Sequence, residues 1–167
     1  NILATIFTNI RTVASAMGHP ERAEALIEKM QADLDRLSQD KPGHGRVAAY
    51  YQRRGFLTGT GTLWDEIMTR AGLVNLAARL DRPSLSRLSL EEMIAARPDF
   101  LVMDSATRTV ADRGTEMMHH PALDRTILPS HRLYLPQSLT VCGGPSYPVA
   151  IAALYAPSLE VDQQVVV

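Results

Sequence analysis

The chain has 167 residues, a length that suits one domain with a sizeable buried core, and its formal net charge is −1. The composition, 46% hydrophobic and 21% charged, is that of a globular protein, and the near-neutral charge excludes the basic surface typical of nucleic-acid-binding domains. No apolar run approaches the ~20 residues of a membrane-spanning helix, and no segment has the pattern of a signal peptide. The single cysteine, Cys142, excludes an internal disulfide and is compatible with reducing and oxidising compartments alike.

Two amphipathic helices are predicted at the beginning of the chain. Apolar residues recur at spacings of three and four from Ile2 to Met17 and again from Glu21 to Leu37, the pattern of helices with one buried face. Gly18 is suited to end the first helix, and Pro20 to begin the second. A polar, glycine-containing loop follows at 40–45. We therefore predict a helical connector over residues 1–45, an α/β domain over residues 46–157 and a tail over residues 158–167.

Three apolar runs predict the strands of a buried sheet. They lie at Val47–Tyr51, Phe100–Met103 and Arg132–Pro136, and the first is apolar on both faces, as a strand covered by helices on both sides is. Because these strands alternate with predicted helices, we expect the α/β class. The expected architecture is a mainly parallel sheet flanked by helices in three layers, a Rossmann-like lobe that follows the helical connector.

The glycine-rich turn at 55–61 is predicted to follow the first strand directly and to lead into a helix near 62–71. Thr62 and Asp65 form a capping pattern at the start of that helix. Glycines before a helix also suggest phosphate binding, but the dinucleotide fingerprint requires a third glycine where this chain has Trp64. A turn that leads into a capped helix is therefore favoured over a ligand contact.

Further helices are predicted after the capping pattern of Ser89 and Glu92 and from about Pro148 onward. Arg113–Arg125 has the mixed polarity of a surface helix followed by an irregular stretch. It includes the adjacent pair His119-His120, whose side chains on a helix would point about 100° apart and could not share a metal ion. No cysteine or carboxylate completes a zinc-like spacing around these histidines, so no metal site and no cofactor are predicted.

Cationic side chains follow the first strand at Arg53 and Arg54, and Arg87 lies in a predicted loop at 83–88. The planar guanidinium fork recognises carboxylates well, although arginines on loops are often merely solvated. An anion site requires the two loops to converge. Asp104 and Ser105 follow the second strand and are expected at the same edge of the sheet.

The segment Cys142–Pro148 is predicted to form the turn between the apolar residues 139–141 and the last helix. Such turns gather at the carboxyl edge of a parallel sheet, where ligands bind, which makes Gly143 and Gly144 candidates for ligand contact. Tyr147 is suited either to pack on a ligand or to pack beneath its own loop. Cys142 has no nearby base to activate it, so a buried structural thiol is favoured over a nucleophile, and no catalytic residue is predicted.

The order of these elements, with the stretches TGTGTLWDEIMTRAGLVNLA and LSLEEMIAARPDFLVMDS, resembles the C-terminal lobe and connecting helix of one family of ABC-importer substrate-binding proteins. These proteins are two-lobed receptors for iron–siderophores, haem and cobalamin. The resemblance extends from about Ile2 to Ala156. It implies a non-enzymatic periplasmic receptor that captures an iron–siderophore-type chelate and delivers it to a permease in the inner membrane. The signal peptide and the N-terminal lobe would lie outside this chain.

The resemblance also implies roles for individual residues. Glu91 takes the position of the acidic residue that docks onto the permease, which leaves Glu92 to cap the helix at Ser89. Leu85 stands where cobalamin receptors carry an aromatic residue, so an iron complex is favoured over cobalamin. The ligand-binding residues are expected along one edge of the sheet: Arg53, Arg54, Arg87, Asp104, Ser105, Gly143, Gly144 and Tyr147.

Two other classes of function remain open. A chelatase-type or nitrogenase-type metal-handling enzyme has the same α/β architecture, and a detectable reaction or a metal bound at His119 or His131 would favour it. A stand-alone interaction module is the third possibility.

Overall fold

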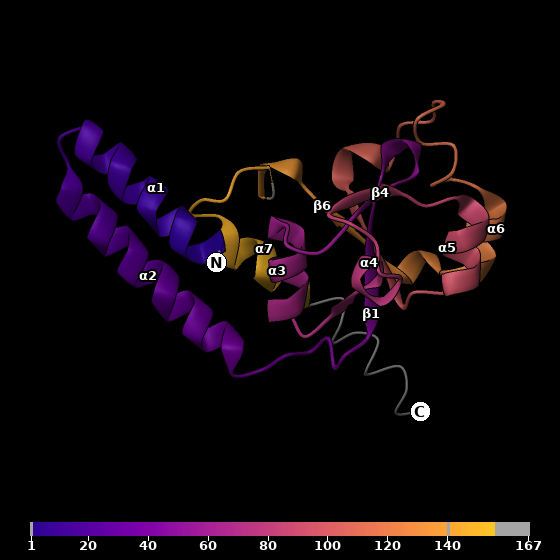
Figure 1. Ribbon diagram of the computed structural model, residues 1–167, viewed down its shortest axis with the longest axis horizontal. Helices are drawn as coiled ribbons and strands as arrows, with labels where there is room; N and C mark the ends of the chain where they lie inside the picture. The colour runs from indigo at the N-terminus through magenta and orange to yellow at the C-terminus, as the bar shows by residue number, and fades with distance from the viewer. Residues whose placement is uncertain (1, 140, 156–167) are drawn as a thin grey trace.

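The computed structural model describes residues 2–139 and 141–155. A helical hairpin lies beside a three-layer α/β domain, and the molecule is elongated because the hairpin projects away from the sheet (Figure 1). The hairpin consists of α1 (Ile2–Ala16) and α2 (Pro20–Ser38), with Gly18 in the left-handed conformation at the turn. Arg11 on α1 forms an ion pair with Glu24 on α2. Both predicted helices are thus confirmed.

The sheet has the strand order β4-β2-β1-β5-β6, with β3 pairing on β1. The pairings β1–β5, β5–β6 and β1–β3 are parallel, whereas β1–β2 and β2–β4 are antiparallel. The mainly parallel sheet predicted from the sequence is therefore confirmed. The strands are β1 (Val47–Gln52), β2 (Phe56–Thr58), β3 (Val74–Asn75), β4 (Leu85–Arg87), β5 (Phe100–Asp104) and β6 (Arg132–Leu135).

Helices cover both faces of the sheet. The hairpin, α3 and α7 lie on one side of it, and α5 and α6 lie on the other (Figure 1). The α-helices of the domain are α3 (Leu63–Arg70), α4 (Leu76–Arg79), α5 (Leu90–Ala96), α6 (Pro121–Thr126) and α7 (Tyr147–Ala153). Within the described residues there are also four short 3-10 segments: η1 (Arg53–Gly55), η2 (Ser105–Thr107), η3 (Pro129–His131) and η4 (Gln137–Leu139).

The core is divided in two by the alternation of side chains along the strands. In β1, Ala48 and Tyr50 face the cluster built with α3, α7 and the hairpin, while Ala49 and Tyr51 face the cluster built with α4, α5 and α6. Both faces are buried, which explains why this strand is a continuous apolar run. Since α1 and α2 contribute to the first cluster, the predicted connector packs directly on the α/β domain.

Two expectations about connections are wrong. The helix near 62–71 does not follow the first strand directly, because the predicted turn at 55–61 contains β2, antiparallel to β1. The predicted loop at 83–88 contains β4, which pairs with β2. Each strand has only three residues, and its formation depends on pairing with a distant partner more than on local pattern.

The order predicted for Arg113–Arg125 is also reversed. Irregular turns come first, held by hydrogen bonds from the backbone N–H groups of Gly114 and Thr115 to the Asp112 carboxylate, and the short helix α6 follows. Pro121 stands at the start of α6, where its missing N–H costs nothing, and the His120 ring accepts a hydrogen bond from the N–H of Ala122. This cap and this proline place the start of the helix.

The buried Tyr51 predicts how stability depends on pH. Its hydroxyl donates to the Leu88 carbonyl at 3.1 Å, and burial, with the charges of Glu91 and Glu92, raises the pKa of Tyr51 to about 12. An unfolded tyrosine titrates near 10, so the unfolded chain loses its proton first. The contribution of Tyr51 to stability is therefore complete below pH 10 and is lost between about pH 10 and 12, by about 1.4 kcal/mol per pH unit.

Urea unfolding at pH 8 to 11 measures this effect. Tyr51→Phe should cost about 1 kcal/mol at neutral pH, because the hydrogen bond to Leu88 is missing. It should also reduce the slope of the unfolding free energy against pH above pH 10 by about 1.4 kcal/mol per pH unit, because one proton fewer is released on unfolding. An alkaline slope equal to that of the parent would contradict the assignment.

Candidate functional site

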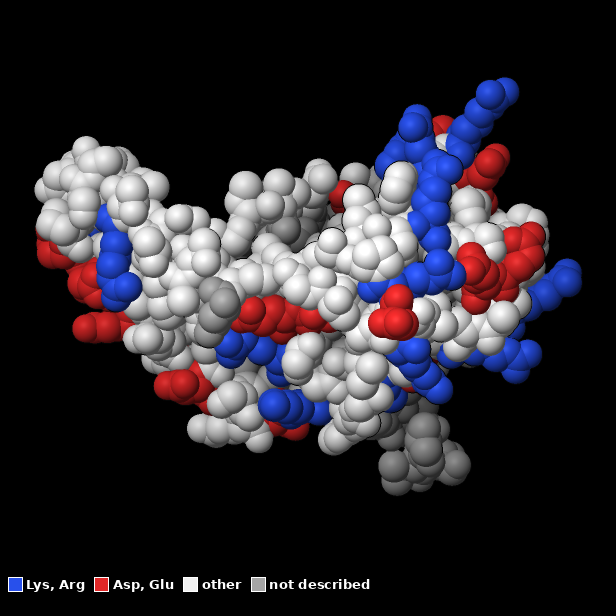
Figure 2. All heavy atoms as spheres, in the orientation of Figure 1, with Lys and Arg blue, Asp and Glu red and all other residues white. Residues whose placement is uncertain are grey.

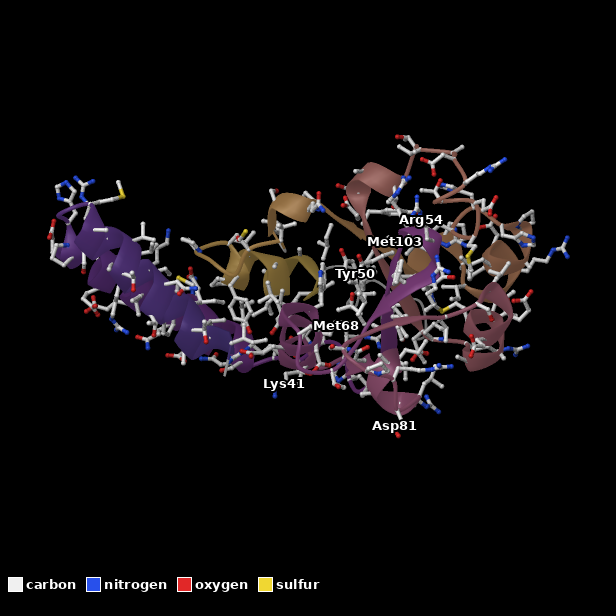
Figure 3. The ribbon with its side chains drawn as sticks, turned by 45° about the horizontal axis from the view of Figure 1, so that its top comes forward. Lys41, Tyr50, Arg54, Met68, Asp81 and Met103 are labelled. Carbon is white, nitrogen blue, oxygen red and sulfur yellow. The ribbon has the colours of Figure 1, made fainter. Side chains whose placement is uncertain are left out.

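The carboxyl ends of β1, β5 and β6 lie at one edge of the sheet because these strands are parallel neighbours. The antiparallel pairing of β2 with β1 and β4 brings Arg87 opposite Phe56 at this same edge. Figure 3 shows Arg54 at this end of the molecule, far from Lys41 and Asp81 at the other. Two separate segments thus meet at one edge of the sheet: η1 with Arg53 and Arg54, and β4 with Arg87.

An open groove of about 620 Å³ lies at this edge, and three arginines line it: Arg54, Arg87 and Arg113. We call it the arginine groove, and its other lining residues are Leu88, Ser89, Glu92, Glu116 and Met117. In Figure 2, basic side chains gather along the upper right edge of the molecule with acidic ones beside them. The groove is therefore lined by three cationic and two anionic side chains.

Arg54 has an unusual backbone conformation, with φ 60° and ψ 23°, in the left-handed region that favours glycine. Its N–H donates to the Gly114 carbonyl at 2.7 Å, which holds the turn in this conformation. Among the described residues, neither Arg54 nor Arg113 has an ion-pair partner, whereas the Arg87 guanidinium lies 5.1 Å from the centre of the Phe56 ring. Two guanidinium groups in the groove are thus available to an anion.

A second, smaller pocket of about 130 Å³ lies beside the ends of β1 and β5. We call it the strand-end pocket, and its lining residues are Tyr50, Gln52, Arg53, Asp104, Thr107 and Gln137. The Tyr50 ring stacks on Trp64 with the ring centres 4.1 Å apart. Burial raises the pKa of Tyr50, and the nearby Asp104 carboxylate raises it further. One oxygen of Asp104 accepts a hydrogen bond from the Ala106 N–H, which fixes the start of η2.

Gly143 and Gly144 lie in a third place, an apolar groove of about 380 Å³ between the hairpin and the start of α7. A Cβ atom on Gly143 would lie 2.8 Å from the Ile6 side chain, so the glycine lets this segment approach α1 closely. Val13 and Met17 line the same groove and are largely exposed. The two glycines therefore adjoin the hairpin and not the arginine groove. Cys142 beside them is exposed, so the prediction of a buried thiol is wrong.

Tyr147 is only 1% exposed. Its hydroxyl donates to a Glu66 carboxylate oxygen at 2.8 Å, and that oxygen also accepts a hydrogen bond from Arg70 at 3.3 Å. Burial and the hydrogen bond to Glu66 both raise the pKa of Tyr147. The ring is therefore packed in the core against α3, with the Arg70 guanidinium 5.8 Å from its centre.

The structure thus distributes the candidate residues over three places. Arg54 and Arg87 share the arginine groove, Arg53 and Asp104 share the strand-end pocket, and Ser105 is exposed next to Asp104. Sequence reasoning missed Tyr50 and Gln52, although an alternation of two places them on the same face at the end of a predicted strand. It also missed Arg113, Thr107 and Gln137, which lie in a turn and in two short 3-10 segments that carry no periodic signal.

The two glutamates at the start of α5 differ in their contacts. Glu92 accepts a hydrogen bond from the Ser89 N–H and pairs with Arg82, and the bond to Ser89 is the main reason that its pKa is lowered. Glu91 is exposed in the first turn and pairs with no described residue. Glu92 is therefore committed to the capping box, and Glu91 is available to a partner.

Across residues 2–139 and 141–155, no helix is long and apolar enough to cross a membrane. The same part of the chain contains no group of three or more His, Cys, Asp or Glu side chains that could hold a metal ion.

A sequence model of the periplasmic binding proteins matches residues 2–127, about three quarters of the chain. The chain belongs to this family. No curated protein sequence matches it.

Solved structures share the fold of this periplasmic binding protein. The haem-binding protein RhuT from Roseiflexus sp. RS-1, in apo form, superposes with a TM-score of 0.73 at 24% identity, over 93% of this chain and 64% of its own. An Fe3+-hydroxamate transport protein from Saccharomonospora viridis gives 0.74 at 17% identity, over 93% and 55%. The haem-binding protein BhuT, in complex with two haems, gives 0.71 at 18% identity, over 95% and 63%. The chain therefore spans less than two thirds of each of these structures.

Proposed function

We propose that this chain is the C-terminal ligand-binding lobe of the substrate-binding component of an ABC importer. The observation that carries the proposal is family membership across residues 2–127. The lobe binds an iron–siderophore-type chelate outside the cytoplasm and presents it to a membrane permease without catalysing a reaction. Neither a resident cofactor nor a bound metal is needed for this role.

The charge of the candidate site supports an anionic ligand. Ferric siderophore complexes and the propionates of haem are often anionic, and arginine forks bind carboxylates through paired hydrogen bonds. Arg54 and Arg113 in the arginine groove are unpaired within the described chain, whereas Arg53 in the strand-end pocket beside them pairs with Asp112. Haem is the second candidate, since two of the three similar structures described above are of haem-binding proteins. Cobalamin is disfavoured, because Leu85 on β4 offers no aromatic ring.

The proposal assigns a part to each region of the chain. Residues 1–45 form the connector, residues 46–157 the ligand-binding lobe and residues 158–167 a tail. The similar structures are longer than this chain, which spans 55% to 64% of their lengths. A second lobe would supply the opposite wall of the ligand site. Glu91, exposed at the start of α5, is the proposed docking residue for the permease.

Titration of this chain with a ferric hydroxamate, haemin and cobalamin tests the proposal. The only tryptophan of the sequence, Trp64, stacks on Tyr50 in the strand-end pocket, so its fluorescence should respond to a ligand at this edge. One lobe leaves much of a chelate in water, whereas binding sites usually bury most of their ligand. We therefore expect weak but saturable binding of one iron chelate, with a dissociation constant of about 10 µM or weaker.

A matched pair of variants shows where the chelate binds. Arg54→Gln should weaken binding about ten-fold, because a charge-assisted hydrogen bond is lost. Arg79→Gln, on α4 and outside all three sites, should leave it unchanged. Failure of all three chelates to bind, together with a detectable metal-insertion reaction, would overturn the proposal in favour of the chelatase-type enzyme.

A further inference from the structure

The segment 110–118 holds η1, the turn that carries Arg53 and Arg54, in place at the carboxyl edge of the sheet. The Arg53 guanidinium donates to an Asp112 carboxylate oxygen at 2.8 Å, and the Arg54 N–H donates to the Gly114 carbonyl at 2.7 Å. A Cβ atom on Gly55 would lie 3.2 Å from the end of the Met117 side chain. The two neighbouring arginines are therefore held by one short segment, but through different groups: one by its side chain and the other by its backbone.

The segment has its own internal support. The other oxygen of Asp112 accepts hydrogen bonds from the N–H groups of Gly114 and Thr115, at 2.7 and 3.1 Å. The buried Thr115 hydroxyl donates to the Val110 carbonyl at 2.7 Å. A group with this many fixed contacts is preorganised, so it holds its partner without reordering when a ligand arrives.

The result is a difference in charge between the two arginines. Arg53 is paired with a carboxylate, and the hydrogen bond from Arg53 is the main reason that the pKa of Asp112 lies below its usual range. Arg54 has no ion-pair partner among the described residues and lines the arginine groove with Arg87 and Arg113. Its left-handed backbone is the kind of local strain that persists where surrounding structure enforces it and that clusters at functional sites.

We propose that Asp112 is a positioning residue that neutralises Arg53 and thereby leaves Arg54 as the arginine of this turn that receives an anionic group of the ligand. The inference rests on the proposed function and names its site more narrowly. It assigns roles that the sequence cannot distinguish, since Arg53 and Arg54 are adjacent and chemically identical.

A double-mutant cycle with citrate as the probe tests the inference, because citrate offers carboxylates without iron or a macrocycle. Arg54→Gln should weaken citrate binding about ten-fold, whereas Arg53→Gln should change it less than about two-fold. The isosteric Asp112→Asn keeps a carbonyl oxygen for the Gly114 and Thr115 N–H groups but removes the charge. In that background Arg53→Gln should weaken citrate binding several-fold, and this coupling is one that a merely structural Asp112 would not produce.

Gly114→Ala provides a second route to the same result. A Cβ atom there would lie 2.7 Å from an Arg53 guanidinium nitrogen, the mobile end of a side chain, so the variant should displace Arg53 from Asp112 without unfolding the protein. It should reproduce the citrate affinity of Asp112→Asn within about two-fold.

Three results would overturn the inference. One is no citrate binding by the parent, another is equal losses from Arg53→Gln and Arg54→Gln, and the third is no coupling between Asp112 and Arg53. These outcomes are independent of the chelate titration. If no iron chelate binds but the citrate cycle shows the coupling, the proposed function fails and the charge assignment stands. If an iron chelate binds but the citrate cycle shows no coupling, the proposed function stands and the charge assignment fails.

Discussion

Replacing Gly59 with alanine should lower the free energy of unfolding by about 3 kcal/mol or more, measured by urea denaturation followed by circular dichroism. A Cβ atom at this position would lie 1.9 Å from the Pro83 carbonyl oxygen and 3.0 Å from the Ser84 Cα. Both contacts are with backbone, which cannot move aside as a flexible side chain can. The Gly59 N–H also donates to the Ser84 carbonyl at 2.7 Å, so the clash lies directly beyond the last pair of β2 and β4, Thr58 with Leu85.

Gly18→Ala is the matched control. Gly18 has φ +77°, and no atom lies within 4 Å of the position that an alanine methyl group would take, so alanine there meets backbone strain but no collision. The expected cost is about 1 kcal/mol. Equal losses for the two variants would contradict the close approach at Gly59. A larger loss at Gly59 than at Gly18 would show that the close approach requires a glycine, as the interpretation of the glycine-rich turn as a lead into a capped helix predicts.

Tyr147→Ala should cost about 4 kcal/mol, because it empties a fully buried ring site and leaves Glu66 without one of its donors. Tyr147→Phe keeps the ring and removes only the hydroxyl, so it should cost about 2 kcal/mol, the range of a hydrogen bond to a charged group. Chemical denaturation measures both values, and the ratio between them separates packing from hydrogen bonding.

The same two variants decide the role of Tyr147 in binding. If Tyr147 is structural, as its contact with Glu66 indicates, Tyr147→Phe should bind iron chelates as the parent does. A ten-fold loss of chelate affinity at unchanged stability would instead make Tyr147 a ligand residue and would refute the structural interpretation.

Local sequence was sufficient for the parts of the fold whose signals are local. The stripe of α2 and the doubly buried run of β1 predicted both elements, because an amphipathic helix leaves a periodic stripe and a strand buried on both faces leaves a continuous apolar run. The capping box was also visible, because Ser89 and Glu92 lie three positions apart in the sequence. In contrast, β2 and β4 have three residues each and exist because they pair with each other and with β1. That kind of pairing leaves little trace in either segment alone.

The candidate site shows the same division. The edge where Arg54 and Arg87 meet follows from the rule that ligands bind at the carboxyl ends of parallel strands, although the antiparallel β2 and β4 that bring Arg87 there were not foreseen. The burial of Tyr147 and the pairing of Arg53 with Asp112 could not be predicted. Both depend on contacts between segments 59 or more residues apart, whose distance in space no local pattern encodes.

The central position of β1 has a consequence for how the chain acquires its structure. The hairpin of α1 and α2 and the pairing of β1 with β2 are built from near neighbours in the sequence, but β1 also pairs with β5, which is synthesised much later: Ala48 pairs with Phe100, and β5 in turn pairs Leu101 with Arg132. Pairing at such separations is slow, because the loops must close before the contacts form. During synthesis the apolar strand Val47–Gln52 therefore lacks its β5 partner until that strand has emerged, and its unpaired edge makes the chain prone to aggregate in this interval.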